Sequence, residues 1–154
     1  VVVPIEYDMV LDFSEGRAAV KKDREWSYID KNNKTVLTTE YEDVGSFHEG
    51  LAKFKDSDEK YGFINTKGEV VIEAQFDHVD DFSEGLAGFW NEEWNDELYD
   101  YEYLYGYINT KGEVVIEPNY EIAYKFKHGI AKVEVDGKIG YIDKNGKYIW
   151  PPSE

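Results

Sequence analysis

The side chains that could carry out chemistry in this chain are mainly carboxylates, because 33 of its 154 residues are Asp or Glu. A glycosidase needs two carboxylates that face each other across a cleft, and the sequence singles out no such pair. Ser14 and Ser83 lie in a recurring Phe-Ser-Glu-Gly motif, but His48 and Lys127 stand at the equivalent positions. This exchange indicates a role in backbone geometry rather than in nucleophilic attack. We therefore predict that the protein is not an enzyme, with a carbohydrate-active enzyme or a purely structural spacer as the alternatives.

The sequence does not indicate a metal site or a cofactor. The chain has no Cys, which removes disulfides, thiolate ligands and thiol nucleophiles. Its three His residues, at positions 48, 78 and 128, lie in or near linkers and lack ligand spacing. Turns such as Asp-Lys-Asn-Gly at 143–146 lack the fifth-position ligand and the distal Glu of an EF-hand. We predict surface His residues, no metal and no cofactor.

The best candidate for a binding site is an insertion rich in aromatic and acidic residues. Residues 88–104 separate Ala87 from Tyr105, whereas only residues 53–60 separate the equivalent Ala52 from Tyr61. Insertions in repeats map to loops on one face, often the binding face. Aromatic planes beside carboxylates could stack on a sugar ring or hold a cationic group. The predicted partner-binding residues are Trp90, Trp94, Tyr99, Tyr101, Tyr103, Asp96 and Asp100. The alternative is an elongated hairpin in which YDYEYLY is an ordinary strand.

These candidates belong to a chain built from repeats. The motif FSEGRA at 13–18 recurs as FHEGLA, FSEGLA and FKHGIA, with spacings of 34, 35 and 44 residues between the Phe positions. A second motif follows each copy, as WSYID at 26–30, YGFIN at 61–65, YGYIN at 105–109 and IGYID at 139–143. Several motifs in a fixed order over four copies predict a tandem repeat protein.

Each repeat predicts a three-stranded antiparallel meander. The many Tyr, Phe, Val and Ile residues favour strands. Asn-Thr-Lys-Gly turns are typical of tight hairpins that close on a left-handed residue. Gly62, Gly106 and Gly140 recur inside a strand, which suggests a close approach of the backbone or of a ring at that point. The predicted turn residues are Gly16, Gly50, Gly85, Gly129, Asn33, Gly68, Gly112 and Gly146.

The expected architecture is all-β, with meanders of about 34–35 residues stacked as an open array over residues 1–154. The divisions are the tail of a partial repeat (1–16), repeat 1 (17–50), repeat 2 (51–85), repeat 3 with the insertion (86–129) and partial repeat 4 (130–154). One meander alone is marginal in water, so neighbouring repeats should bury its apolar faces. A propeller-like closure is the alternative, although its blades usually have four strands.

The motifs FSEGLA, YGFINTKGEVVIEAQF and YGYINTKGEVVIEPNY resemble those of the WG-repeat (KWG-type) family of bacterial β-repeat proteins. The signature Trp-Gly pair is replaced here by Trp26-Ser27 and Tyr61-Gly62, and in the later repeats by Tyr105-Gly106 and Ile139-Gly140. The resemblance implies a binding or scaffold module within a larger bacterial protein and brings no catalytic residues. It favours an exported or cell-surface protein.

The formal net charge of −16 limits the possible partners. Such a surface repels phosphate backbones and anionic membranes, and no Lys/Arg cluster offsets it. No apolar run approaches the roughly 18 residues of a membrane span. We predict a protein or carbohydrate partner, no nucleic acid and no membrane insertion. Because the chain begins at Val1 without Met, we expect a removed leader or a segment of a longer protein.

Overall fold

The computed structural model describes residues 5–153, all of whose regular structure is β-strand. The chain divides into two compact units, Val1–Gln75 and Phe76–Glu154. Every four-stranded sheet is antiparallel, and none in the described part of the chain closes into a barrel. The predicted all-β repeat class is thereby confirmed. No described residue lies in a helix, so there is no membrane-spanning helix among them.

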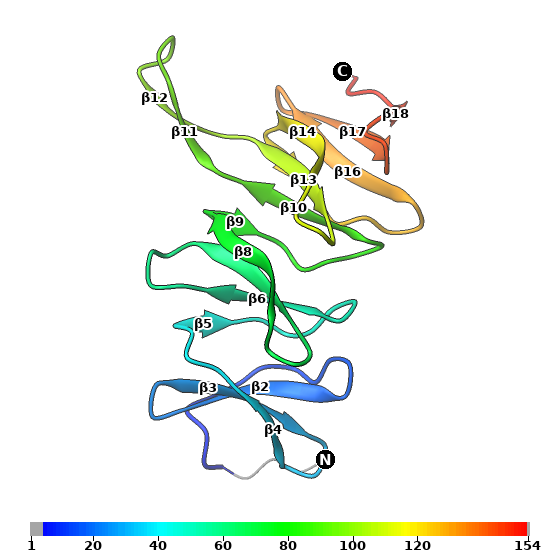
Figure 1. The fold of residues 1–154 in the computed structure, drawn as a ribbon. Coiled ribbons are helices and arrows are strands. Elements are labelled where there is room, and N and C mark those ends of the chain that lie inside the picture. Colours follow the sequence, from blue (N-terminus) through cyan, green and yellow to red (C-terminus); the bar gives the residue numbers. More distant parts are fainter. Residues whose placement is uncertain (1–4, 154) are drawn as a thin grey trace. The chain divides into compact units, whose positions relative to one another are not determined.

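The first unit contains two sheets (Figure 1). The first sheet consists of β1 (Met9–Val10), β2 (Arg17–Lys22), β3 (Glu25–Asp30) and β4 (Thr35–Thr38). The second sheet consists of β5 (Asp43–Val44), β6 (Leu51–Lys55), β7 (Tyr61–Asn65) and β8 (Val70–Phe76), which ends at the unit boundary. In both sheets the strands are neighbours in the order of the sequence.

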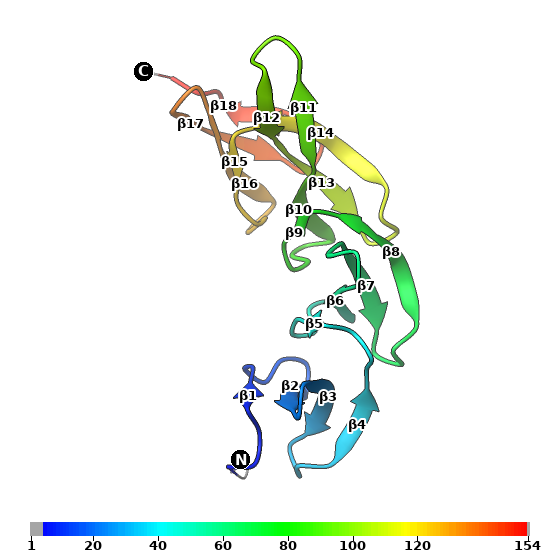
Figure 2. The same cartoon turned by 90° about the vertical axis from the view of Figure 1, so that its left-hand side faces the viewer.

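The second unit repeats this plan with one addition (Figure 2). The third sheet contains β9 (His78–Val79), β10 (Leu86–Trp90), β13 (Tyr105–Asn109) and β14 (Val114–Tyr120). Between β10 and β13 lies a two-stranded hairpin of β11 (Glu92–Asn95) and β12 (Asp100–Tyr103). The fourth sheet contains β15 (Ile122–Ala123), β16 (Ile130–Val135), β17 (Lys138–Asp143) and β18 (Tyr148–Trp150).

Each of the four repeat sheets has four strands rather than the predicted three. The additional strand is only two residues long and comes from the linker before the F-x-E-G motif, as in Asp43–Val44 pairing with Phe54 and Lys55. Met9–Val10, assigned from the sequence to the tail of a partial repeat, forms this strand in the first sheet. A two-residue strand is too short to show the alternation that predicts strands, which is why the sequence did not reveal it.

The turn residues adopt the conformations that the motifs predict. Gly68, Gly112 and Gly146 have φ of 82°, 81° and 77°, and Asn33 has φ of 61°. Gly16, Gly50, Gly85 and Gly129 also have positive φ, and the residue before each has φ between 52° and 55°. In the first repeat, Ser14 and Arg17 exchange two backbone hydrogen bonds of 2.9 and 3.1 Å around the two turn residues. The F-x-E-G motif is therefore a two-residue hairpin turn of the kind with two left-handed residues.

The recurring strand glycines mark a close approach, as predicted. A Cβ at Gly106 would lie 2.6 Å from the carbonyl oxygen of Ile116, and one at Gly62 would overlap the carbonyl of Ile72. Both contacts are to backbone, which cannot move aside as a flexible side chain does. At Gly140 the nearest atom would be a side-chain carbon of Pro152, at 2.9 Å. Glycine is thus needed where the outer strand bends over its neighbour.

Consecutive sheets within each unit are joined by the same set of contacts, which we call the repeat joint. In unit 1, Tyr28 packs on Phe47 with ring centroids 4.8 Å apart and donates a hydrogen bond of 2.7 Å to the Gly45 carbonyl. In unit 2, Tyr107 packs on Phe126 at 4.9 Å and donates a hydrogen bond of 2.6 Å to the Tyr124 carbonyl. All four rings are fully buried. Within each unit, the two repeats therefore share one apolar core.

Polar contacts of the F-x-E-G turn complete the repeat joint. Ser14 Oγ donates to the Phe47 carbonyl, and the Glu15 carboxylate accepts from the Gly50 N–H at 3.0 Å. In unit 2, Ser83 Oγ donates to the Phe126 carbonyl at 2.7 Å. The Glu84 carboxylate accepts from the Gly129 N–H at 3.1 Å. The Ser and Glu of one turn therefore hold the turn of the next repeat, a role that the sequence alone did not reveal.

Candidate functional site

The hairpin β11–β12 lengthens the connection between β10 and β13, which in the first sheet is the two-residue turn Asp23-Arg24. Both views show it projecting from the third sheet (Figures 1 and 2). Its strands pair in regular register, with Glu92 opposite Tyr103 and Trp94 opposite Tyr101. The insertion is therefore an ordered hairpin, as the alternative interpretation of YDYEYLY expected.

One face of the hairpin is aromatic. Because side chains alternate along a strand, Glu92, Trp94, Tyr101 and Tyr103 share this face. Trp94 and Tyr101 form an edge-on pair with centroids 5.2 Å apart, yet they remain 52% and 49% exposed. Tyr103 is 47% exposed and donates a hydrogen bond of 2.8 Å to Glu92 Oε1. This bond, which stabilises the protonated phenol, raises the pKa of Tyr103. The aromatic face thus presents ring surfaces with carboxylates at their edges.

Trp90 lies at the base of the hairpin rather than on it. It is the last residue of β10, pairs with His78 across the third sheet, and is partly buried. Its ring stacks on His78 at 5.5 Å and meets the edge of Tyr103 at 5.1 Å. His78 in turn lies 3.0 Å from Asp80 through Nε2 and Oδ1. Trp90 therefore connects the aromatic face to the sheet, a different position from that of Trp94.

The remaining predicted site residues lie at the far end of the hairpin. Asp96 Oδ1 accepts a hydrogen bond of 2.9 Å from the Trp94 indole, which fixes the plane of that ring. Tyr99 has a left-handed φ of 52° and is 81% exposed. Asp100 begins β12 and accepts from its neighbouring Tyr101 N–H at 2.8 Å. The structure thus brings Trp94, Tyr101 and Asp96 together and leaves Tyr99 apart at the turn.

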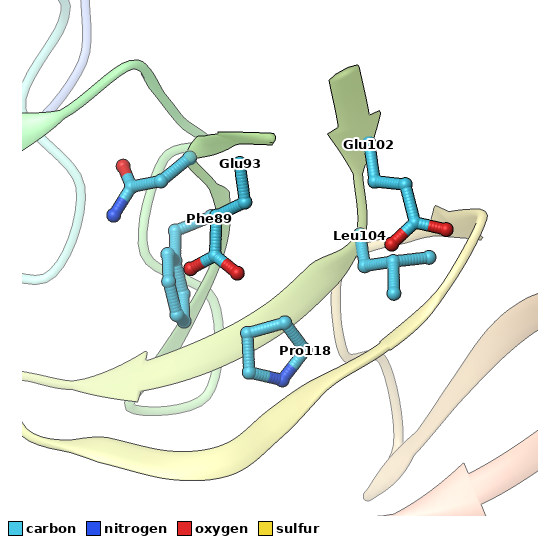
Figure 3. Close-up of a pocket in the computed structure, with 6 residues that line it drawn as sticks. Phe89, Glu93, Glu102, Leu104 and Pro118 are labelled. Atoms are coloured by element: carbon cyan, nitrogen blue, oxygen red, sulfur yellow. The ribbon is translucent and has the colours of Figure 1, made fainter. Parts of the chain in front are cut away.

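The opposite face of the hairpin is acidic. Glu93 and Glu102 lie directly across from each other in the ladder, where like charges destabilise the pair. Their carboxylates point toward the strand that carries Pro118 (Figure 3). Together with Asn91, Phe89, Leu104 and Pro118 they line a hollow of about 60 Å³. Ligand pockets usually measure about 300 Å³ or more, so this hollow does not enclose a sugar ring.

No group of three or more His, Asp or Glu side chains within the described residues is arranged to hold a metal ion. His48 and His128 lie at different positions of the F-x-E-G motif, the second and the third, in different sheets, and His78 packs on Trp90. The hairpin exposes ring faces with carboxylates beside them.

Comparison with known protein families gives one match. A family model described as "WG containing repeat" matches residues 1–26, 26–60, 61–89 and 105–138. The interval between the last two matches, residues 90–104, contains the whole hairpin β11–β12. No curated protein matches the chain. The repeated sheets are thus the part that this chain shares with the family, and the hairpin lies outside the matched residues.

Proposed function

Since the chain belongs to the WG-repeat family, we propose that it is a non-catalytic binding or scaffold module whose contact region is the hairpin β11–β12. The single observation that supports this proposal is an ordered hairpin that keeps large aromatic side chains in water. Trp94, Tyr101 and Tyr103 are each about half exposed on one face. None of the three belongs to the core clusters of the repeats. Exposed aromatic side chains with fixed orientation are typical of binding surfaces.

The charge of the hairpin favours a basic partner. Residues 90–104 contain no Lys, Arg or His. They carry six carboxylates, at Glu92, Glu93, Asp96, Glu97, Asp100 and Glu102. A Lys or Arg side chain could lie over the Trp94 or Tyr101 ring and reach a carboxylate at the same time. The proposed partner is therefore a protein segment that carries Lys or Arg, because a neutral sugar has no positive charge to pair with these carboxylates.

Trp94→Ala tests this proposal in the full chain, with an arginine-rich peptide as the probe and a polyglycine-serine peptide as the uncharged comparison. We expect the substitution to weaken peptide binding by roughly tenfold, because a desolvated cation–π contact contributes about that much. The matched control is Trp150→Ala, since Trp150 is 62% exposed and lies outside the hairpin. Binding would be followed by titration calorimetry, and folding by the melting temperature.

Three outcomes would contradict the proposal. Equal binding by Trp94→Ala and Trp150→Ala would show that the peptide is attracted only by the net negative charge of the chain and does not contact the Trp94 ring. A melting temperature strongly lowered by Trp94→Ala would place this residue in the structural core. Binding of a neutral oligosaccharide, lost with Trp94→Ala, would replace the basic partner by a carbohydrate while keeping the binding role.

A further inference from the structure

The hollow on the acidic face of the hairpin β11–β12 lies where the hairpin joins the third sheet, and all of its lining residues belong to unit 2. Figure 3 shows two lining side chains on each side of it, with Pro118 between them: Phe89 and Glu93 face Glu102 and Leu104. The hollow thus combines apolar walls with one carboxylate on either side. It depends on the insertion, because Glu93 and Glu102 belong to the two strands of the hairpin.

The apolar walls of this hollow are held in place by the third sheet. Phe89 is 4% exposed, and its ring packs on Phe76 with centroids 5.2 Å apart. Pro118 lies in the irregular part of β14, and its backbone nitrogen is 2.9 Å from the position that a Cβ at Gly106 would occupy. Leu104 connects the hairpin to β13 and is partly buried. The hollow is therefore a packed feature of the unit rather than a gap beside a loose turn.

The two carboxylates at the hollow have no counter-charge of their own. Glu93 and Glu102 are directly opposite in the antiparallel ladder, where Cβ atoms are about 4.5–5.5 Å apart. Within residues 5–153, neither carboxylate has a hydrogen-bond or ion-pair partner. Like charges at directly opposite positions destabilise a ladder. A cation placed between these two carboxylates would therefore remove a repulsion as well as accept new hydrogen-bond partners.

The size of the hollow and its acceptors fit an alkyl ammonium group. Its volume of about 60 Å³ exceeds the roughly 10–15 Å³ that one water-sized group needs. Two carboxylates are too few for Ca²⁺, which takes about six to eight oxygen ligands, and the Asn91 oxygen already accepts from the Asp77 N–H at 3.0 Å. A Lys side chain ends in a compact ammonium with N–H donors only, on an apolar stem. The guanidinium of Arg is a wider, planar group.

We propose that this hollow binds the end of a Lys side chain from the basic partner of the proposed function, on which the choice of a protein ligand rests. The ammonium donates hydrogen bonds to the carboxylates of Glu93 and Glu102, and the terminal methylenes lie against Phe89 and Pro118. The aromatic face, on the opposite side of the hairpin, stays available for a second basic side chain. The two faces therefore differ in selectivity: the exposed rings accept Lys or Arg, whereas the hollow selects Lys.

A nuclear magnetic resonance titration of the full chain with n-butylammonium, which reproduces the end of a Lys side chain, tests the hollow directly. We expect saturable shifts of the Glu93 and Glu102 amides and of the Leu104 methyl groups. Glu102→Gln should weaken this binding by roughly tenfold, because it removes a hydrogen bond between two charged groups. The matched control is Glu97→Gln, which removes the same charge from the hairpin turn and should bind like the unchanged chain. Tetramethylammonium, which has no N–H, should shift these signals far less.

Lysine-rich and arginine-rich peptides of equal length and charge separate the hollow from the aromatic face. Glu102→Gln should weaken binding of the lysine-rich peptide by roughly tenfold and leave that of the arginine-rich peptide nearly unchanged. If Trp94→Ala does not weaken the arginine-rich peptide while this effect of Glu102→Gln persists, the contact on the aromatic face fails and the hollow stands.

Three results would overturn the hollow as a Lys site, whatever Trp94→Ala does. These are equal effects of Glu102→Gln on the two peptides, equal effects of Glu97→Gln and Glu102→Gln, and equal shifts with tetramethylammonium and n-butylammonium.

Discussion

At the scale of single residues, Tyr107 combines three roles in one side chain. It fills the shared core of unit 2, stacks on Phe126 and donates a hydrogen bond to the Tyr124 carbonyl. Burial raises the pKa of its phenol above the ordinary value of 10.0, with a smaller contribution from Asp80. The phenol therefore ionises first in the unfolded chain. Its contribution to stability is complete below pH 10 and falls as the pH rises above that value.

Tyr107→Phe should lower the free energy of unfolding by about 1 kcal/mol at pH 7, because the ring stack remains while the hydrogen bond is lost. The difference from the unchanged chain should shrink as the pH rises above 10, since Phe cannot ionise. Urea unfolding at both pH values would measure this. Tyr99→Phe, at an exposed phenol, is the control. An equal loss at both pH values would contradict the linkage between burial and ionisation.

At the scale of elements, the two faces of the hairpin β11–β12 have opposite effects on its stability: an aromatic pair stabilises one face, and repulsion between like charges destabilises the other. The aromatic face has the Trp94–Tyr101 pair, while the acidic face opposes Glu93 to Glu102. Glu102→Lys should stabilise the hairpin by about 0.2–1 kcal/mol, because it converts a like-charge pair into an opposite-charge pair. Amide hydrogen exchange of Trp94 would report the gain. Glu97→Lys in the hairpin turn makes the same change of net charge without a partner in the ladder, and an equal gain there would contradict the pairwise explanation.

The elements were predictable to the extent that they repeat. The left-handed turn residues and the close approach at Gly62 and Gly106 followed from recurring Gly in fixed motifs. The two-residue strands did not, because they carry no periodicity. The contacts of Ser14 and Glu15 with the next repeat were also missed. The recurrence of these residues was visible in the sequence. Recurrence alone does not show whether a side chain forms hydrogen bonds within its own turn or with the turn of the next repeat.

The sequence located the candidate site but did not show how its side chains are arranged. The length of the insertion and its aromatic residues pointed to residues 90–104. The separation of Trp90, on the sheet beside His78, from Trp94, on the exposed face, depends on where β10 ends. Strand ends are set by pairing with neighbouring strands, and the sequence alone does not give this register.

At the scale of the whole molecule, the net charge of −16 opposes folding through self-repulsion. The described ion pairs involve partly or largely exposed side chains, such as Lys22 with Glu6 at 3.1 Å, and contribute little. Raising the salt from about 0.01 to 0.1 M shortens the screening length from about 30 to about 10 Å. The melting temperature should therefore rise by about 2–5 °C over this range at pH 7. The response should vanish near the isoelectric point, and a fall in melting temperature at pH 7 would contradict net repulsion.

The place of the hairpin in its repeat has a consequence for how such chains diversify. The connection that it occupies is filled by Asp23-Arg24 in the first repeat, by residues 56–60 in the second and by Asp136-Gly137 in the fourth. The flanking strands β10 and β13 still pair from Leu86 to Phe89 in the usual antiparallel register. Chain length at this position is thus free to vary without disturbing the shared core. A series of repeats could carry a different recognition loop on each, and gain or lose specificities one loop at a time.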